Sequence, residues 1–241
     1  MSLEEAWEAE AARMIAWVRA PGHDSYWYFR EGFFDLLPAP GRATLDLGCG
    51  EGRVARDLAA RGHRVVGIDA SPSLVAAACE ADRAGEYLVA DATALPFDDG
   101  AFDLVVAYNS LMDVEDVRGA VREAARVLQR GGCLCLAIVH PVNSAGAFAG
   151  GSDESPFVIE GSYLEERRYA ETLSRDGLTM TFHSVHRPLA GYAGCLEESG
   201  FVVEALREPA APSEASGRWG VPSVARWRRL PVFLWLRAAL R

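Results

Sequence analysis

The apolar residues between positions 42 and 141 follow two alternating patterns. Short, nearly continuous apolar runs are typical of strands buried on both faces of a sheet. Amphipathic segments with helical periodicity separate several of these runs. Such alternation predicts a parallel sheet flanked by helices. The apolar runs cover residues 43–47, 64–69, 86–91, 101–108 and 133–141, and the helical patterns cover 53–62, a segment that opens at Ser71 and Pro72, and 117–130.

Capping signals support these helices and predict another at the start of the chain. Ser71 is placed as an N-cap, with Pro72 at the first helical position, and Gly62 as a C-cap. Ser2 and Glu5 form a capping-box pattern ahead of apolar residues at helical spacing. We therefore expect an amphipathic helix at the N-terminus, packed against a partner surface.

The segments outside this regular region have signals of their own. The aromatic-rich stretch 21–41 is expected to be a loop that covers a pocket. Asp176 and Gly177 form a turn signal between two strand-like segments, which predicts a β-hairpin. The tail 226–241 is compatible with a membrane-surface helix, but Pro231 disfavours a continuous helix, so we expect an arginine-rich loop and a last strand.

A glycine-rich loop follows the first apolar run and indicates a ligand site. Gly48, Gly50 and Gly52 allow a tight turn and a close approach of the backbone to a ligand, and Asp69 is placed to bind ribose hydroxyls. A dinucleotide site has similar features, but its fingerprint requires glycine where this chain has Arg53. Because ligands lie beyond the carboxyl ends of parallel strands, this loop should share one rim with residues at the ends of the later strands. Those residues are Asp91, Tyr108 and His140.

Four ordered motifs, LDLGCGEG, VVGIDAS, VADATALPF and FDLVVAYNSLMDV, resemble those of class I S-adenosylmethionine-dependent methyltransferases, in their small-molecule branch. The resemblance implies a doubly wound, mostly parallel seven-stranded α/β sheet, the Rossmann-like methyltransferase fold, with an N-terminal helical cap and a hairpin lid. It implies one domain, with a cap at 1–41, a cofactor-binding core at 42–140, a lid at 141–190, and a closing helix and strands at 191–241. The cofactor is expected to be S-adenosyl-L-methionine. The predicted cofactor-binding residues are Tyr28, Arg30, Asp46, Gly48, Cys49, Gly50, Asp69, Ala70, Ser71, Asp91, Ala92 and Tyr108.

Methyl transfer from a sulfonium mainly requires the acceptor to be held in line in a dry pocket. A hydroxyl acceptor also benefits from a base, whereas a neutral amine does not need one. His140 and His186 are the predicted catalytic bases. The acidic run that ends in Asp116 is interpreted as the cap of the helix that starts near Val117.

Composition narrows the possible partners. The net charge of −10 disfavours nucleic acid and favours a small-molecule acceptor, and all the basic residues are arginine. The five scattered cysteines suggest neither a disulfide framework nor a metal site, so a cytoplasmic protein without metal is expected, as a monomer or homodimer with no membrane segment. A nicotinamide-dependent oxidoreductase and a non-catalytic S-adenosylmethionine-binding protein are the alternative functions.

Overall fold

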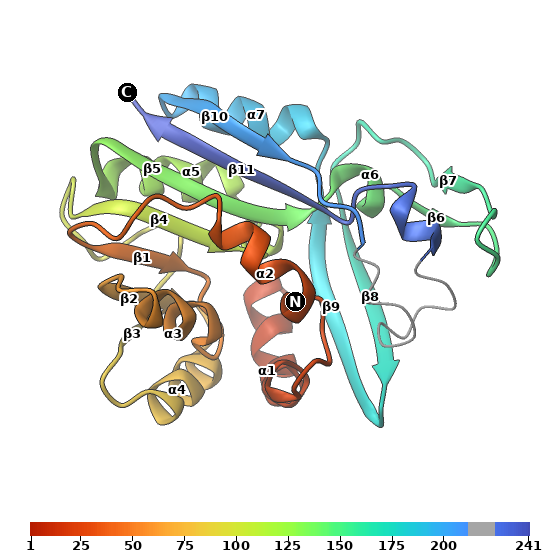
Figure 1. The fold of residues 1–241 in the computed structure, drawn as a ribbon, viewed down its shortest axis with the longest axis horizontal. Coiled ribbons are helices and arrows are strands. Elements are labelled where there is room, and N and C mark those ends of the chain that lie inside the picture. The colour runs from red at the N-terminus through yellow and green to blue at the C-terminus, as the bar shows by residue number, and fades with distance from the viewer. Residues whose placement is uncertain (212–224) are drawn as a thin grey trace.

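The computed structural model describes residues 1–211 and 225–241, and a seven-stranded sheet lies at its centre (Figure 1). The strand order is β10-β11-β5-β4-β1-β2-β3. The pairs among β1 to β5 are parallel, and β11 is antiparallel to both of its neighbours. The predicted mostly parallel sheet is therefore confirmed. The strands are β1 (Thr44–Leu47), β2 (Val65–Asp69), β3 (Glu86–Val89), β4 (Phe102–Tyr108), β5 (Leu128–Val139), β10 (Phe201–Arg207) and β11 (Phe233–Leu240).

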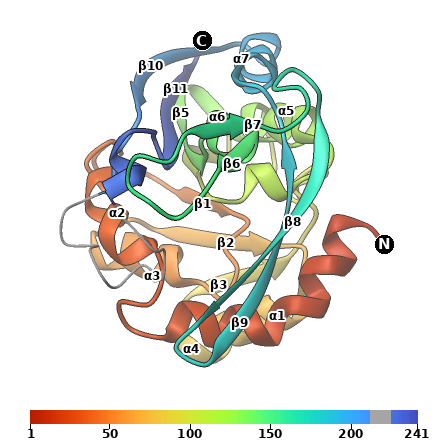
Figure 2. The ribbon, with the colours of Figure 1, turned by 90° about the vertical axis from the view of Figure 1, so that its right-hand side faces the viewer.

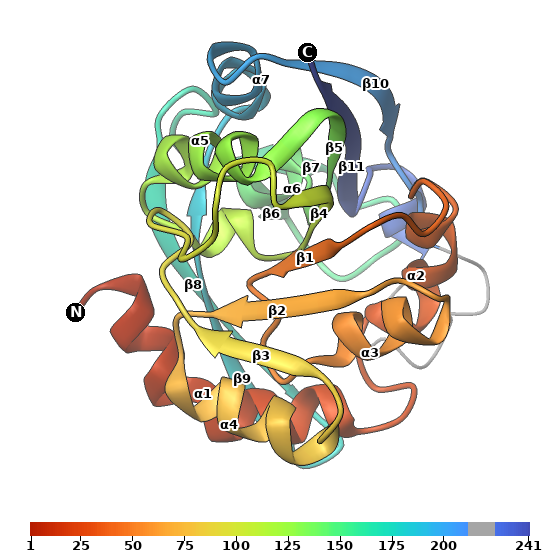
Figure 3. The same ribbon diagram turned by 90° about the vertical axis from the view of Figure 1, so that its left-hand side faces the viewer.

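Helices cover both faces of this sheet (Figure 3). On one face, α5 (Val117–Val127) and α7 (Leu189–Glu198) bury side chains such as Val121 and Leu196 against β1, β4 and β5. On the other face, α2 (Tyr26–Phe34) and α3 (Arg53–Ala60) pack against the opposite side of β4 and β5. The fourth strand is thus buried on both sides, as its uninterrupted apolar sequence predicts. Helix α4 (Pro72–Ala81) adjoins β2 and β3.

The predicted helix boundaries hold at three of the capped ends. The Ser71 side chain accepts a hydrogen bond from the Leu74 amide at the start of α4, and Asp116 accepts one from the Gly119 amide at the start of α5. The capping box of Ser2 and Glu5 is present in α1 (Leu3–Arg19). Helix α5 is shorter than the predicted pattern 117–130, because β5 begins at Leu128 and passes through Gly131 and Gly132. The register between β4 and β5 shifts beside these glycines, which marks an irregularity that glycine tolerates.

The remaining elements stand at the carboxyl ends of the strands. They are η1 (Leu111–Asp113), α6 (Pro141–Ser144), β6 (Gly146–Phe148), β7 (Phe157–Ile159), β8 (Arg167–Arg175), β9 (Leu178–His186) and η3 (Ala225–Arg228). The β8–β9 hairpin turns at Asp176 and Gly177, where φ is +49° and +79°. Positive φ at both turn residues is typical of the tight hairpin turn that the sequence predicts. The hairpin packs on α1 through Trp17, Val18 and Met180 (Figure 2).

The aromatic segment before the sheet differs from its prediction as a covering loop. It forms α2, and Tyr26, Phe29 and Phe33 lie buried against β4, β5 and β11. These rings are three and four residues apart, which places them on one face of a helix. Edge-on contacts between Phe33 and both Tyr108 and Trp235 fix the helix on the sheet.

Candidate active site

A cavity of about 1240 Å³ opens at the carboxyl ends of β1, β2 and β4. The strand ends form one side of it, and α1 and the β8–β9 hairpin form the other (Figure 1). Cavities that hold one drug-sized ligand measure roughly 300 to 1,000 Å³. This cavity therefore has room for a cofactor and a second molecule.

The glycine loop forms the floor of the cavity, and its shape depends on left-handed backbone. Gly48 has a φ of +76°, and a Cβ atom on it would collide with the side chain of Ser110. The amides of Gly48 and Cys49 both donate to the Ile68 carbonyl at 2.8 Å, which ties the loop to the end of β2. Only glycine combines this backbone conformation with such close packing.

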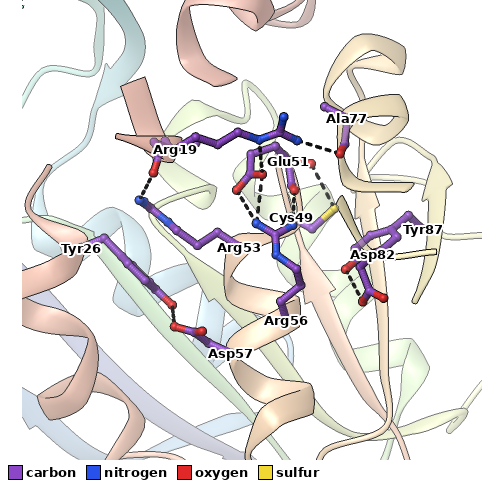
Figure 4. Close-up of polar contacts among 12 residues, drawn as sticks. Arg19, Tyr26, Cys49, Glu51, Arg53, Arg56, Asp57, Ala77, Asp82 and Tyr87 are labelled. Atoms are coloured by element: carbon purple, nitrogen blue, oxygen red, sulfur yellow. Dashed lines mark hydrogen bonds and ion pairs between the residues drawn. The ribbon is translucent and has the colours of Figure 1, made fainter. Parts of the chain in front are cut away.

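A buried glutamate in the loop connects it to α1 and α3 (Figure 4). Glu51 is 3% exposed; it accepts hydrogen bonds from Arg56 at 2.9 and 3.0 Å and from Arg19 at 3.1 Å. Arg53 donates to the Val18 carbonyl at 3.0 Å. The N-terminal helix is therefore held against the glycine loop by arginines from both sides.

Asp69, at the end of β2, lies beside this loop. One of its carboxylate oxygens accepts the Gly50 amide at 2.8 Å, and the other accepts the Ser71 amide at 2.9 Å. Burial raises the pKa of Asp69, and these amide hydrogen bonds oppose the rise. Farther along the rim, Asp91 accepts the amide and the hydroxyl of Thr93. Both carboxylates line the cavity.

The end of β4 presents polar atoms that lack protein partners. The Tyr108 hydroxyl and the Asn109 Oδ1 are buried, and neither atom has a hydrogen-bond partner among residues 1–211 and 225–241. Asn109 has a φ of +54°, an unusual conformation for a non-glycine residue. Both residues line the cavity, and unpaired buried polar groups combined with backbone strain are typical of ligand sites. A polar ligand fits this position.

The sequence and the fold both match known methyltransferases. Residues 45–136 match a family model described as a methyltransferase domain. A solved structure of an S-adenosylmethionine-dependent methyltransferase from Mesorhizobium loti aligns with a TM-score of 0.72 at 27% identity, over 89% of this chain and 97% of that one. These matches confirm the predicted resemblance to the class I methyltransferases and the predicted fold. They also support S-adenosylmethionine, the cofactor that the resemblance implies.

Curated relatives match this chain only over part of their length. A 2-methyl-6-phytyl-1,4-hydroquinone methyltransferase of Synechocystis sp. is 40% identical over 110 residues, 44% of this chain and 34% of that protein. A demethylmenaquinone methyltransferase of Beutenbergia cavernae is 38% identical over 121 residues, half of each chain. The chain thus spans between a third and half of these relatives. No helix within the described residues has the length and apolar character needed to cross a membrane.

Most of the residues predicted to bind the cofactor line the cavity together. Tyr28 and Arg30 do not: the Tyr28 hydroxyl donates to the Gly22 carbonyl, and Arg30 pairs with Asp57 at 3.2 Å. Their placement at the cavity is therefore wrong, because α2 packs its aromatic face on the sheet. The residues that do line the cavity are Gly48, Cys49, Gly50, Asp69, Ala70, Ser71, Asp91, Ala92 and Tyr108.

Asp46 lies beneath the glycine loop and does not line the cavity. Its side chain is buried within the sheet, and its Oδ2 has no hydrogen-bond partner in the described part of the chain. Burial, together with the nearby charge of Asp69, raises the pKa of Asp46 to about 7.

The two histidines predicted as bases are both away from the cavity. His140 faces Glu208 through Nε2 at 2.9 Å and accepts the Val142 amide on Nδ1 at 3.1 Å. His186 is 0% exposed. Its Nδ1 is hydrogen-bonded to the Ser144 hydroxyl, and its Nε2 to the Tyr163 carbonyl. Burial lowers the pKa of both. With both ring nitrogens engaged, these histidines hold α6 and the lid in place, and neither of them lines the cavity.

The wall opposite the strand ends was not predicted residue by residue. Alternate residues of β8 face the cavity, which follows from the period of two in a strand once the hairpin is recognised. Asp113 also lines the cavity, although the acidic run that contains it was attributed wholly to capping α5. Asp116 is the residue that caps the helix. The wall residues on the hairpin are Arg167, Tyr169, Ala170, Glu171, Leu173, Arg175, Phe182 and Ser184.

Proposed function

We propose that this methyltransferase transfers the methyl group of S-adenosylmethionine to an oxygen or nitrogen of a small organic acceptor. The observation that carries the proposal is a single cavity that joins the glycine-loop rim to the hairpin wall and exceeds the volume of one ligand. The curated relatives are named as methyltransferases of a hydroquinone and of demethylmenaquinone, which supports an organic acceptor of modest size.

In this proposal, different rim residues bind different parts of the cofactor. The glycine loop holds the methionine part, Asp69 the ribose hydroxyls, and Asp91 with Ala92 the adenine. Arg53 replaces the predicted Arg30 among the cofactor-binding residues, because it lines the cavity and lies over the Tyr26 ring at 4.0 Å. Its guanidinium is suited to a carboxylate such as that of the methionine part.

The bound cofactor supplies a methyl group already activated on a sulfonium. The chain's own task is to hold the acceptor in line and to exclude water. Trp17 and Phe182 line the hairpin side of the cavity with apolar rings, and Tyr108 borders the rim where the two ligands meet. In this division, residues 42–140 bind the cofactor, and residues 1–41 and 141–190 close over the acceptor.

The alternative functions have less support. A dinucleotide fingerprint needs glycine at position 53, where Arg53 instead anchors α1. A protein that only binds the cofactor has no need of the large remaining space beside Tyr108. We further propose a cytoplasmic protein that is a monomer or homodimer.

Calorimetry and a methyl-acceptance screen test this function. We expect S-adenosylmethionine and its demethylated product, S-adenosylhomocysteine, to bind with micromolar affinity, and NADH not to bind. Radiolabelled methyl transfer to a panel of phenols, amines and carboxylic acids then identifies the acceptor class. Failure to bind either sulfur compound contradicts the proposal.

A further inference from the structure

Asp113 occupies the junction between the cofactor rim and the hairpin wall. It ends η1, directly after β4, and its side chain lines the cavity. The Ser184 hydroxyl, on β9, donates to its Oδ1 at 2.6 Å. Its Oδ2 accepts no hydrogen bond from any residue that the structure describes. One carboxylate oxygen is thus fixed, and the other is available to a ligand.

The loop that carries Asp113 is fixed to the hairpin by a buried arginine. Arg187 follows β9 and is 1% exposed. It donates to the carbonyls of Val114 at 2.6 Å and Glu115 at 2.7 Å, the two residues after Asp113. The position of the carboxylate is therefore set by the strand that also supplies Ser184, as preorganised sites require.

Charged and titratable groups surround Asp113 on four sides. Asp69 faces it from β2, Tyr169 from β8, Tyr192 from α7, and Arg187 from beyond β9. Burial raises the pKa of Asp113 well above its ordinary value, and the charge of Asp69 adds to the rise. The Ser184 hydrogen bond and Arg187 oppose it. A carboxylate with a raised pKa is a stronger proton acceptor once it is ionised.

Several other carboxylates that line the same cavity make contacts of their own within the protein. Asp24 pairs with Arg53 at 2.7 Å, and Glu51 pairs with Arg56 at 2.9 Å. Both oxygens of Asp69 accept backbone amides. Asp116 caps α5. Asp24 also keeps one oxygen without a partner, Oδ1, but its other oxygen is ion-paired with Arg53. Asp113 has no ion pair within the described part of the chain, and it lies at the junction of the rim and the hairpin wall.

We propose that Asp113 is the general base of the reaction and that the acceptor reacts through a hydroxyl group. The inference rests on the proposed methyl transfer. A neutral amine attacks through a lone pair and sheds its proton afterwards, so it needs no base in that step. A hydroxyl must lose its proton as the new bond forms, which explains a carboxylate held beside the rim.

The step balances without any further reactant. The acceptor oxygen forms a bond to the methyl carbon while the carbon–sulfur bond breaks, and that electron pair stays on sulfur, which becomes a neutral thioether. The hydroxyl proton passes to Oδ2 of Asp113. The neutral carboxylic acid then releases the proton to solvent after the methyl ether leaves.

The test compares three variants, Asp113→Asn, Asp113→Glu and Ser184→Ala, with the wild type. The acceptors are substituted phenols and aliphatic alcohols, and matched amines are assayed in parallel. Asp113→Asn should bind S-adenosylhomocysteine within threefold of wild type in calorimetry. Its kcat with hydroxyl acceptors should fall by about 100-fold or more, the usual contribution of a general base. Asp113→Glu should recover part of this loss. Glu115→Gln is the matched control, because this carboxylate lies in the same loop and pairs with Arg168.

The pH dependence of kcat adds a measurement that a purely structural role does not change. Wild-type kcat should rise with pH as Asp113 ionises, and Asp113→Asn should lose this rise. Because the Ser184 hydrogen bond lowers the pKa of Asp113, Ser184→Ala should move the rise to higher pH. Thermal unfolding shows whether Asp113→Asn folds properly. If it does not, the shift of the pH profile in Ser184→Ala still tests the proposal.

The outcomes separate the two proposals. The inference is overturned by an Asp113→Asn enzyme with near-wild-type kcat and an unchanged pH profile. It is also overturned by a wild type that methylates amines but none of the hydroxyl acceptors. A wild type that fails to bind S-adenosylhomocysteine, or that methylates neither set, contradicts the proposed function itself.

Discussion

The two sides of the cavity are held together in different ways. The cofactor rim depends on hydrogen bonds between neighbouring loops, such as the Gly50 amide on Asp69, 19 residues apart. The hairpin wall depends on contacts between distant segments: the Trp7 indole donates to the His183 carbonyl at 2.9 Å across 176 residues. The Thr181 amide donates to Glu10 at 3.3 Å across 171 residues.

This difference separates what backbone geometry fixes from what packing fixes. At the rim, glycines with positive φ and the ends of parallel strands leave few conformations open, so residue types there are restricted. On the wall, α1 and the hairpin need only complementary apolar surfaces, and many side chains satisfy that requirement. We expect substitutions at the rim to reduce cofactor binding and substitutions at the wall to alter acceptor binding.

The largest effect is expected from Gly48→Ala. The new methyl group collides with Ser110, and an alanine must adopt a φ near +76°. Left-handed strain and overpacking together should lower the free energy of unfolding by about 4 kcal/mol. Binding of S-adenosylhomocysteine should weaken more than about 100-fold, because the loop moves by the size of a methyl group. Denaturant unfolding and calorimetry measure the two changes.

Gly50→Ala is the matched control for that substitution. Gly50 also has a positive φ, of +56°, but among the described residues, its chain neighbours aside, no atom lies within 4 Å of an added Cβ. The strain alone should cost about 1 kcal/mol. Equal losses in the two variants would mean that the contact with Ser110 does not matter.

On the wall, Trp17→Ala should separate stability from cofactor binding. Trp17 is 3% exposed, between α1 and the hairpin, and its loss should reduce the free energy of unfolding by about 3 kcal/mol. The KM for the acceptor should rise at least as much as the dissociation constant of S-adenosylhomocysteine. Trp27→Ala removes a half-exposed ring and should change stability by less than about 1 kcal/mol. A selective loss of cofactor affinity in Trp17→Ala would reverse our assignment of the two sides.

The sequence predicted the rim better than the wall, because backbone geometry restricts the residue types at the rim, whereas the wall depends on packing between distant segments. Gly48, Asp69 and Tyr108 are identified by their places after strands, and the parallel topology brings them together. The catalytic prediction relied on residue type and missed that His140 and His186 have both ring nitrogens occupied, since Glu208 and Ser144 come from distant segments. Alternation of residues 167–175 could have indicated the inner face of the hairpin, but not what it faces.

Asp46 provides a pH-dependent probe of the rim. Its pKa is about 7 in the folded protein, against roughly 4 when unfolded. The folded state therefore binds the proton more tightly, so this group's contribution to stability is present at low pH and is lost as pH rises from about 4 to 7. Between pH 5.5 and 8, the loss should be about 2 kcal/mol. Asp46→Asn should remove it, and urea unfolding of both proteins at the two pH values measures the difference. Identical pH dependence in both proteins would contradict an elevated pKa at this position.

The smallest expected effect distinguishes the two aspartates at the border between rim and wall. Asp116→Ala removes the side chain that accepts the Gly119 amide at 2.9 Å, and loss of such a cap costs about 1 kcal/mol of stability. The helix keeps its packed face, so S-adenosylhomocysteine affinity should stay within about twofold of wild type, as thermal unfolding and calorimetry together check. A cofactor-affinity loss of tenfold would show that α5 positions the rim, and that the acidic run after β4 acts as one unit. A change in stability alone means that the two aspartates act separately: Asp116 caps the start of α5, and Asp113, three residues earlier, serves the ligand site.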